Sequence, residues 1–92
     1  VGDYRVIFHL QSDAPASIKV GSWDVTAQVG RERLASGDVM GTGGKLGEVV
    51  GQFRIISRKH GADLETRLFF EDVADVLFAD VVIEPAEYVQ IH

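Results

Sequence analysis

Apolar and polar residues alternate along most of the chain, which is typical of β-strands with one buried face. In residues 3–11 the apolar positions of one parity are Tyr4, Val6, Phe8 and Leu10. In residues 64–70 the positions that share a face are Leu64, Thr66, Leu68 and Phe70. Both patterns predict strands whose inner side chains enter a common core, and Val6, Phe8 and Leu68 are expected there.

Two further segments change the parity of their apolar positions by one residue. In residues 17–29 one parity holds Ile18 and Val20, and the other holds Trp23, Val25, Ala27 and Val29. In residues 76–84 the inward positions are Val76 and Phe78, followed by Val81 and Ile83. One extra residue in a continuous strand shifts the phase in this way. We therefore predict bulges near Gly21-Ser22 and at Ala79-Asp80.

Turn residues separate these segments, and no stretch of ten or more residues keeps the period of a helix. Pro15 interrupts residues 12–16, residues 30–32 form a tight hairpin, and residues 41–47 are rich in glycine. Residues 33–40 alternate poorly and are expected at a sheet edge. About six or seven short strands with turns between them predict an all-β, antiparallel β-sandwich.

Length and composition narrow the class of protein. The 92 residues suit one domain, residues 1–92. A net charge of −5 argues against nucleic acid and anionic membranes as partners. No apolar run is long enough for membrane insertion, and the lack of cysteine fits a cytoplasmic protein. Because Val1 already stands at a strand entrance, we expect no signal peptide and a module belonging to a larger protein.

Three motifs occur in a suggestive order: Gly-Asp-Tyr-Arg-Val-Ile-Phe at 2–8, Trp-Asp-Val-Thr-Ala at 23–27 before Arg-Leu-Ala at 33–35, and the segment 74–85 that ends in Ile-Glu-Pro. Together they resemble the galactose-binding-domain-like jelly-roll sandwich, a carbohydrate-binding-module-like domain appended to bacterial glycosyltransferases, methyltransferases and other polysaccharide enzymes. The resemblance implies an oligosaccharide or polysaccharide ligand and neighbouring catalytic domains as partners. The chain departs from the family in lacking earlier strands and in having Ala79 where an aspartate is usual.

Several other kinds of site are disfavoured by the residues themselves. The loop at 41–47 lacks the spacing and the following helix of a phosphate-binding loop. His9, His60 and His92 are expected to be solvated, because nothing in their spacing indicates zinc. Two interpretations of Glu71, Asp72, Asp75 and Asp80 stay open. They form either a calcium site or a solvated acidic turn. No cofactor and no catalytic residue set is predicted, since no nucleophile or carboxylate pair stands out.

Sugar binding requires an exposed aromatic ring beside planar polar groups, because a sugar stacks its C–H face and hydrogen-bonds its hydroxyls. The candidate ligand-binding residues are Phe69, Arg67, Arg5, His9, Trp23 and Asp24, with Tyr4 and Tyr88 as further aromatics. Phe69 has the parity opposite to its neighbours and is expected to be exposed. Trp23 shares the parity of Val25, so the core is favoured for it, with an exposed platform as the alternative.

The sequence thus predicts a non-catalytic, carbohydrate-binding-module-like accessory domain of a bacterial polysaccharide-processing protein. The alternative is a structural or protein-interaction β-sandwich with no glycan ligand, because mixed polar and apolar outer positions such as Arg5, Ile7 and His9 suit a docking interface equally well.

Overall fold

The computed structural model describes residues 2–56 and 63–86, and these residues form six β-strands. The strands are β1 (Gly2–Ser12), β2 (Lys19–Ala27), β3 (Glu32–Met40), β4 (Leu46–Ile55), β5 (Glu65–Phe70) and β6 (Val76–Pro85). Among the described residues there is no helix that could cross a membrane. Because residues 2–56 and 63–86 contain six strands and no helix of any kind, the all-β prediction is confirmed.

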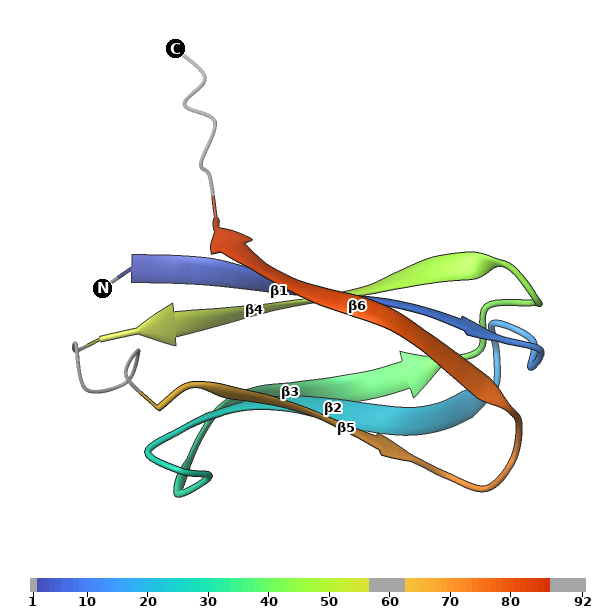
Figure 1. The fold of residues 1–92 in the computed structure, drawn as a ribbon, viewed down its shortest axis with the longest axis horizontal. Helices are drawn as coiled ribbons and strands as arrows, with labels where there is room; N and C mark the ends of the chain where they lie inside the picture. The colour runs from blue at the N-terminus through green and yellow to red at the C-terminus, as the bar shows by residue number, and fades with distance from the viewer. Residues whose placement is uncertain (1, 57–62, 87–92) are drawn as a thin grey trace, which may run out of the picture.

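The strands form two antiparallel sheets that face each other as two layers (Figure 1). One sheet has the order β4-β1-β6 and the other has the order β3-β2-β5. The central strands β1 and β2 bury most of their inward side chains, and Val6, Phe8 and Val25 are completely buried. The period-2 pattern thus produces a sandwich-like pair of sheets with one apolar interior, because alternate side chains leave a strand on opposite faces.

The bulge predicted in β6 is confirmed. Asp80 pairs with His9 of β1, but the next residue of β1, Leu10, pairs with Phe78, so Ala79 is left over. The extra residue restores the inward direction for Phe78 on one side of the bulge and for Val81 on the other. An acidic residue at position 80 can therefore face outward within an otherwise apolar strand.

The irregularity predicted in β2 is also present, but two inward positions are wrong. The register with β3 shifts between Lys19 and Gly21, and Val20 between them is buried. Ile18 precedes the strand and is exposed. Val29 is exposed as well, because β2 ends at Ala27 and Val29 lies in the turn with a φ of 57°. The alternation of the sequence thus continues beyond the end of the strand, where it no longer predicts burial.

The core is built around Trp23, whose side chain is almost completely buried. Its ring centroid lies 5.8 Å from that of Phe8 in the opposite sheet. Space for the indole comes from two glycines. A Cβ atom at Gly37 would come within 2.6 Å of the Trp23 Nε1 atom, and one at Gly51 would overlap the ring. The predicted core position of Trp23 is therefore confirmed, and the alternative of an exposed platform is wrong.

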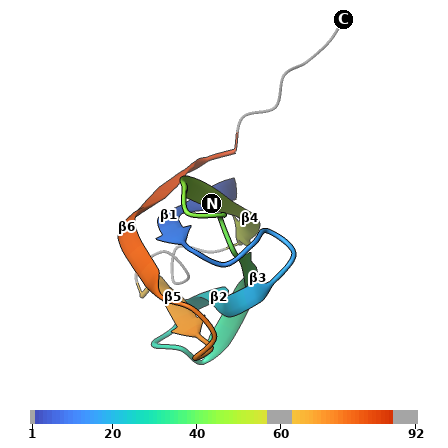
Figure 2. The ribbon, with the colours of Figure 1, turned by 90° about the vertical axis from the view of Figure 1, so that its right-hand side faces the viewer.

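The two sides of the sandwich-like fold differ. On the closed side, β3 of one sheet runs close to β4 of the other, whereas β5 and β6 make far fewer contacts on the opposite, open side (Figure 2). An apolar cleft of about 320 Å³ lies on the open side. Its lining residues are Phe8, Thr66, Leu68, Phe70, Phe78 and Val81. Ile83, predicted in the core, faces inward beside Val6 yet stays exposed for the same reason.

Candidate binding groove

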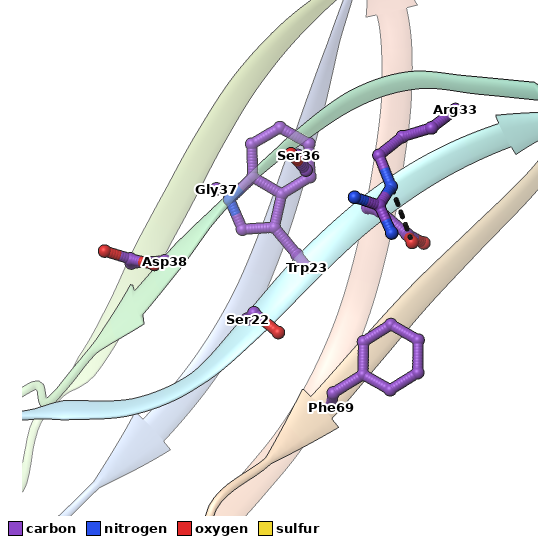
Figure 3. Close-up of a pocket in the computed structure, with 8 residues that line it drawn as sticks. Ser22, Trp23, Arg33, Ser36, Gly37, Asp38 and Phe69 are labelled. Carbon is purple, nitrogen blue, oxygen red and sulfur yellow. Dashed lines mark ion pairs between the residues drawn. The ribbon is translucent and has the colours of Figure 1, made fainter.

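The outer face of the β3-β2-β5 sheet carries a groove, which we call the polar groove, with a volume of about 230 Å³. It is lined by Ser22, Trp23, Asp24, Arg33, Ser36, Gly37, Asp38 and Phe69 (Figure 3). The strand register explains this set, because cross-strand partners share a face. One row of partners joins Asp38, Ser22 and Phe69, and the next joins Ser36, Asp24 and Arg67.

Asp24 is the structural centre of the polar groove. Its side chain is only 3% exposed although it lies on the outer face of the sheet. Arg67 donates two hydrogen bonds to it, from Nε to Oδ1 at 2.8 Å and from Nη2 to Oδ2 at 2.7 Å. This planar, two-point geometry is strong and fixes the guanidinium in one orientation. The hydrogen bonds to Asp24 also raise the pKa of Arg67 above its ordinary value.

Phe69 stands beside this pair on β5, and it is 49% exposed, as predicted. The Arg67 Cζ atom lies 5.3 Å from the centroid of the Phe69 ring, within cation–π range. The ring is thereby supported by a side chain that is itself held by Asp24. An aromatic surface of this kind is rigid and still open to solvent.

Other groups of the polar groove remain open to a ligand. Arg33, whose side chain is 64% exposed, lies 3.6 Å from an Asp24 oxygen, as the dashed line in Figure 3 marks. That distance is too long for a hydrogen bond, so the Arg33 N–H groups can donate elsewhere. Ser22 and Ser36 add hydroxyl groups on the same face, and Asp38 lies 3.3 Å from Lys19. Donors, acceptors and an apolar ring thus converge.

Arg5 and His9, the other two predicted ligand-binding residues, lie on the other sheet. Both point outward from β1, on the face of the β4-β1-β6 sheet that is turned away from the polar groove. Arg5 forms an ion pair of 2.6 Å with Glu84 of β6. The structure therefore does not bring Arg5 or His9 together with Asp24, Arg67 and Phe69 in one site. Side-chain parity gives the face within a sheet but not which sheet a strand joins.

His9 is not simply solvated, which corrects the expectation from sequence. It lies half-buried between its two cross-strand neighbours. Its Nδ1 atom forms a hydrogen bond with the Asp80 carboxylate, and its Nε2 atom lies 3.1 Å from the Glu48 Oε1 atom. The hydrogen bond to Asp80 first, and that to Glu48 second, raise the pKa of His9 above 6.5. This cluster ties β6 to β1. His60, His92 and Tyr88 lie outside the described residues.

Several residues of the polar groove are missed by sequence reasoning, namely Arg33, Ser36 and Asp38 of β3. In principle the sequence could reveal these residues, because counting positions outward from the hairpin at 30–32 gives the partner in β2 of each residue in β3. A register shift between Val25 and Thr26 defeats that counting. The further candidate aromatic Tyr4 instead packs partly buried against the core, with its ring centroid 5.8 Å from that of Phe53.

The acidic residues considered for calcium are not gathered around one point. Asp80 is engaged by His9, and Glu71 lies 3.7 Å from Lys19. Within residues 2–56 and 63–86, no three acidic or histidine side chains are arranged to hold a metal ion. The glycine-rich segment at 41–47 connects β3 to β4, and the Thr42 hydroxyl fastens it to Ser12 at 3.0 Å.

Comparisons of this chain with protein-family models, with curated proteins and with solved structures find no match. The resemblance to galactose-binding-domain-like modules accordingly stays a prediction. The geometry of the polar groove is the remaining guide to function.

Proposed function

We propose that this chain is a non-catalytic carbohydrate-binding module and that its glycan binds in the polar groove. The observation that carries the proposal is the exposed Phe69 ring held beside the fixed pair of Asp24 and Arg67. A sugar ring can stack on Phe69 while its hydroxyls meet Arg33, Ser22 and Ser36. Few precisely placed polar groups around an aromatic surface are the usual composition of a ligand site.

The size of the polar groove sets the scale of the ligand. Its volume of about 230 Å³ is below the range of about 300–1,000 Å³ typical of sites for drug-sized ligands. A single sugar ring of a longer glycan suits this space, with the rest of the chain lying along the sheet. Affinity for one such unit is expected to be weak, in the range that multivalent attachment enhances.

The charged groups of the polar groove favour binding over catalysis. A general base must be free to take a proton from its substrate. Asp24 instead accepts two hydrogen bonds from Arg67, and Asp38 lies beside Lys19. Both carboxylates thus act as structural acceptors in this proposal, and hydrolysis or transfer of the glycan falls to another domain.

The sequence resemblance extends this proposal to the parent protein. A galactose-binding-domain-like jelly roll would serve as an accessory domain of a bacterial polysaccharide-processing protein, of glycosyltransferase or methyltransferase type, in the cytoplasm. Its work would be to hold the polysaccharide near neighbouring catalytic domains.

The test is a glycan array followed by an NMR titration of the full chain with the best monosaccharide found. We expect amide shifts at residues 22–24, 33–38 and 67–69. Phe69→Ala and Arg33→Gln should each weaken binding by about tenfold or more, because each removes a central contact.

Matched controls exist on the same strand and on the other sheet. Phe70→Ala removes the neighbouring ring, which faces the cleft on the open side instead of the polar groove. Arg54→Gln removes an exposed arginine that binds Asp3 on the other sheet. Both should leave glycan affinity unchanged. Absence of binding to every glycan, or equal losses in controls and test variants, would show that the polar groove is not a sugar site.

The second candidate function is a structural or protein-interaction module with no glycan ligand. The observation that favours it is the open side, where Phe70 and Phe78 of facing strands are about half exposed. Exposed apolar surface of this kind commonly marks a docking site. The array experiment separates the two functions, because only the first predicts a glycan.

A further inference from the structure

The open side combines three features, of which the first is its apolar cleft. Leu68 and Phe70 form one wall from β5, and Phe78 and Val81 form the other from β6. The cleft reaches inward as far as Phe8, a fully buried core residue. These side chains belong to the two inner faces of the sheets and not to an outer surface. The cleft is therefore a part of the interior that the described strands leave uncovered.

The second feature is that both strands beside the cleft are edge strands. β6 pairs only with β1, and β5 pairs only with β2, among residues 2–56 and 63–86. A strand with one partner has backbone N–H and C=O groups along its other edge that can pair with a further strand. At 10 residues, β6 offers the longer edge.

The third feature is charge. Residues 63–86, which include both edge strands, contain seven acidic residues and a single arginine. On β6, Asp80 and Glu84 point outward. Asp80 binds His9 and Glu84 binds Arg5, both on the side of β6 that faces β1. A strand added beside β6 would place its own outward side chains next to these two carboxylates. Opposite charges in such cross-strand positions are favourable.

The charges also disfavour one arrangement of a second copy, in which its own β6 is the added strand. An antiparallel pair of β6 strands centred on Val82 would set Asp80 of each copy opposite Glu84 of the other. Like charges directly opposite each other destabilise a sheet. The edge suits a basic strand, and β6 itself has no basic residue.

We propose that the edge of β6 binds an extended, basic and apolar segment of a partner protein by β-strand addition. The partner strand extends the sheet to β4-β1-β6-partner. Its apolar side chains, at every second position, enter the cleft between Phe78 and Phe70, and its lysines or arginines lie beside Asp80 and Glu84. Main-chain hydrogen bonds supply affinity and the alternate pockets supply selectivity in this mode of recognition. The inference is independent of glycan binding.

The experiment titrates the full chain with a synthetic ten-residue peptide in which valine and lysine alternate, matching the length of β6. The expected result is amide shifts and slowed hydrogen exchange along residues 76–85, with little change along β4. Two control peptides define the mode. The same peptide with N-methylated backbone amides cannot form a ladder, and a valine–glutamate peptide has the wrong charge. Both should bind at least about tenfold more weakly, because each loses one of the proposed interactions.

Variants of neighbouring residues locate the contact. Phe78→Ala, in the cleft, should weaken peptide binding about tenfold, whereas Leu77→Ala, on the outer face of the same strand, should not. Urea unfolding of both variants checks that each is folded. If Phe78→Ala is not folded, Phe70→Ala tests the opposite wall of the cleft.

Four results would overturn the proposal. The first is a monomeric chain that does not bind the peptide. The second is equal binding of the N-methylated or acidic peptide. The third is a dimer in which the β6 amides that point away from β1 are already protected, which would make a second copy the occupant. The fourth is the same protection in a monomer, which would mean that the chain covers its own edge.

Discussion

The closed and open sides of this fold share the same alternating sequence pattern, but their inward side chains are buried to different degrees. On the closed side, Val39 and Phe53 belong to strands that run past each other, and both are buried. On the open side, Phe70 and Phe78 also point inward from alternating strands, yet about half of each ring is exposed. Alternation therefore specifies the direction of a side chain, and its burial depends on whether another layer covers it.

The two sides are also held together differently. Packing of Trp23 against Phe8 and the two glycines dominates near the closed side. Polar cross-strand pairs join edge strands to central strands on both sides, as Arg54 of β4 with Asp3 shows, but β5 and β6 lack the close packing between the two sheets. Arg67 of β5 binds Asp24, and Asp80 of β6 binds His9. The open side is thus expected to be the less stable part of the domain.

The strongest test compares two phenylalanines that pack at different depths. Phe8→Ala should lower the free energy of unfolding by about 3–5 kcal/mol, because it leaves a cavity in the core. Phe78→Ala should cost only about 1 kcal/mol, because half of the ring is in solvent already. Urea unfolding of both variants measures the difference. Equal losses would contradict the distinction between the closed and open sides.

The second-largest loss in the free energy of unfolding is expected from adding a side chain beside Trp23. Gly51→Ala places a methyl group where the indole ring lies, and overpacking of this kind costs about 1–3 kcal/mol. The control is Val50→Ala, whose side chain is exposed on the outer face of the same strand. A Gly51→Ala variant as stable as the wild type, measured by thermal or urea unfolding, would mean that the core near the closed side is loosely packed.

A smaller effect is expected at the link between β2 and β5. Asp24→Asn removes the charge that orients Arg67 and should lower the free energy of unfolding by about 1–2 kcal/mol. Hydrogen exchange should speed up in β5 more than in β4, since only β5 depends on this pair. The matched control is Asp38→Asn on the same face, whose partner Lys19 is exposed. Uniform acceleration over all strands would argue against a separately held β5.

The smallest effect concerns pH and the link between β1 and β6. Because Asp80 and Glu48 raise the pKa of His9 above 6.5, the folded state binds the proton more tightly than the unfolded state. The resulting stabilisation is complete below the unfolded value of 6.5 and is lost as the pH rises through the raised folded pKa. The urea midpoint of the wild type should therefore fall towards that of His9→Gln over this interval.

An NMR titration of the His9 ring measures the same pKa directly. In the Asp80→Asn variant, which lacks the main cause of the shift, the pKa should move back towards 6.5. An unchanged His9 pKa in that variant would exclude the proposed link to β6.

Much of the fold follows from sequence because its signals are local. The phase change at Ala79 and the buried parity of Trp23 are visible in a few neighbouring residues, and both are confirmed. The sheet that each strand joins is a non-local property, so the sequence does not reveal that Arg5 and Arg67 lie on opposite outer faces. The exposure of Ile83 is not visible in the sequence for a related reason, since alternation does not show whether a facing strand is present.

The leftover residue in β6 has a genetic consequence. Loss of the single codon for Ala79 would remove the bulge and leave Asp80 directly after Phe78. With the pairing of Phe78 kept, Val81 and Ile83 would still point inward and Asp80 and Glu84 outward, because the alternation becomes regular. A three-nucleotide deletion is therefore expected to be better tolerated at this codon than at that of Val82, whose loss would turn Ile83 outward and Glu84 into the interior.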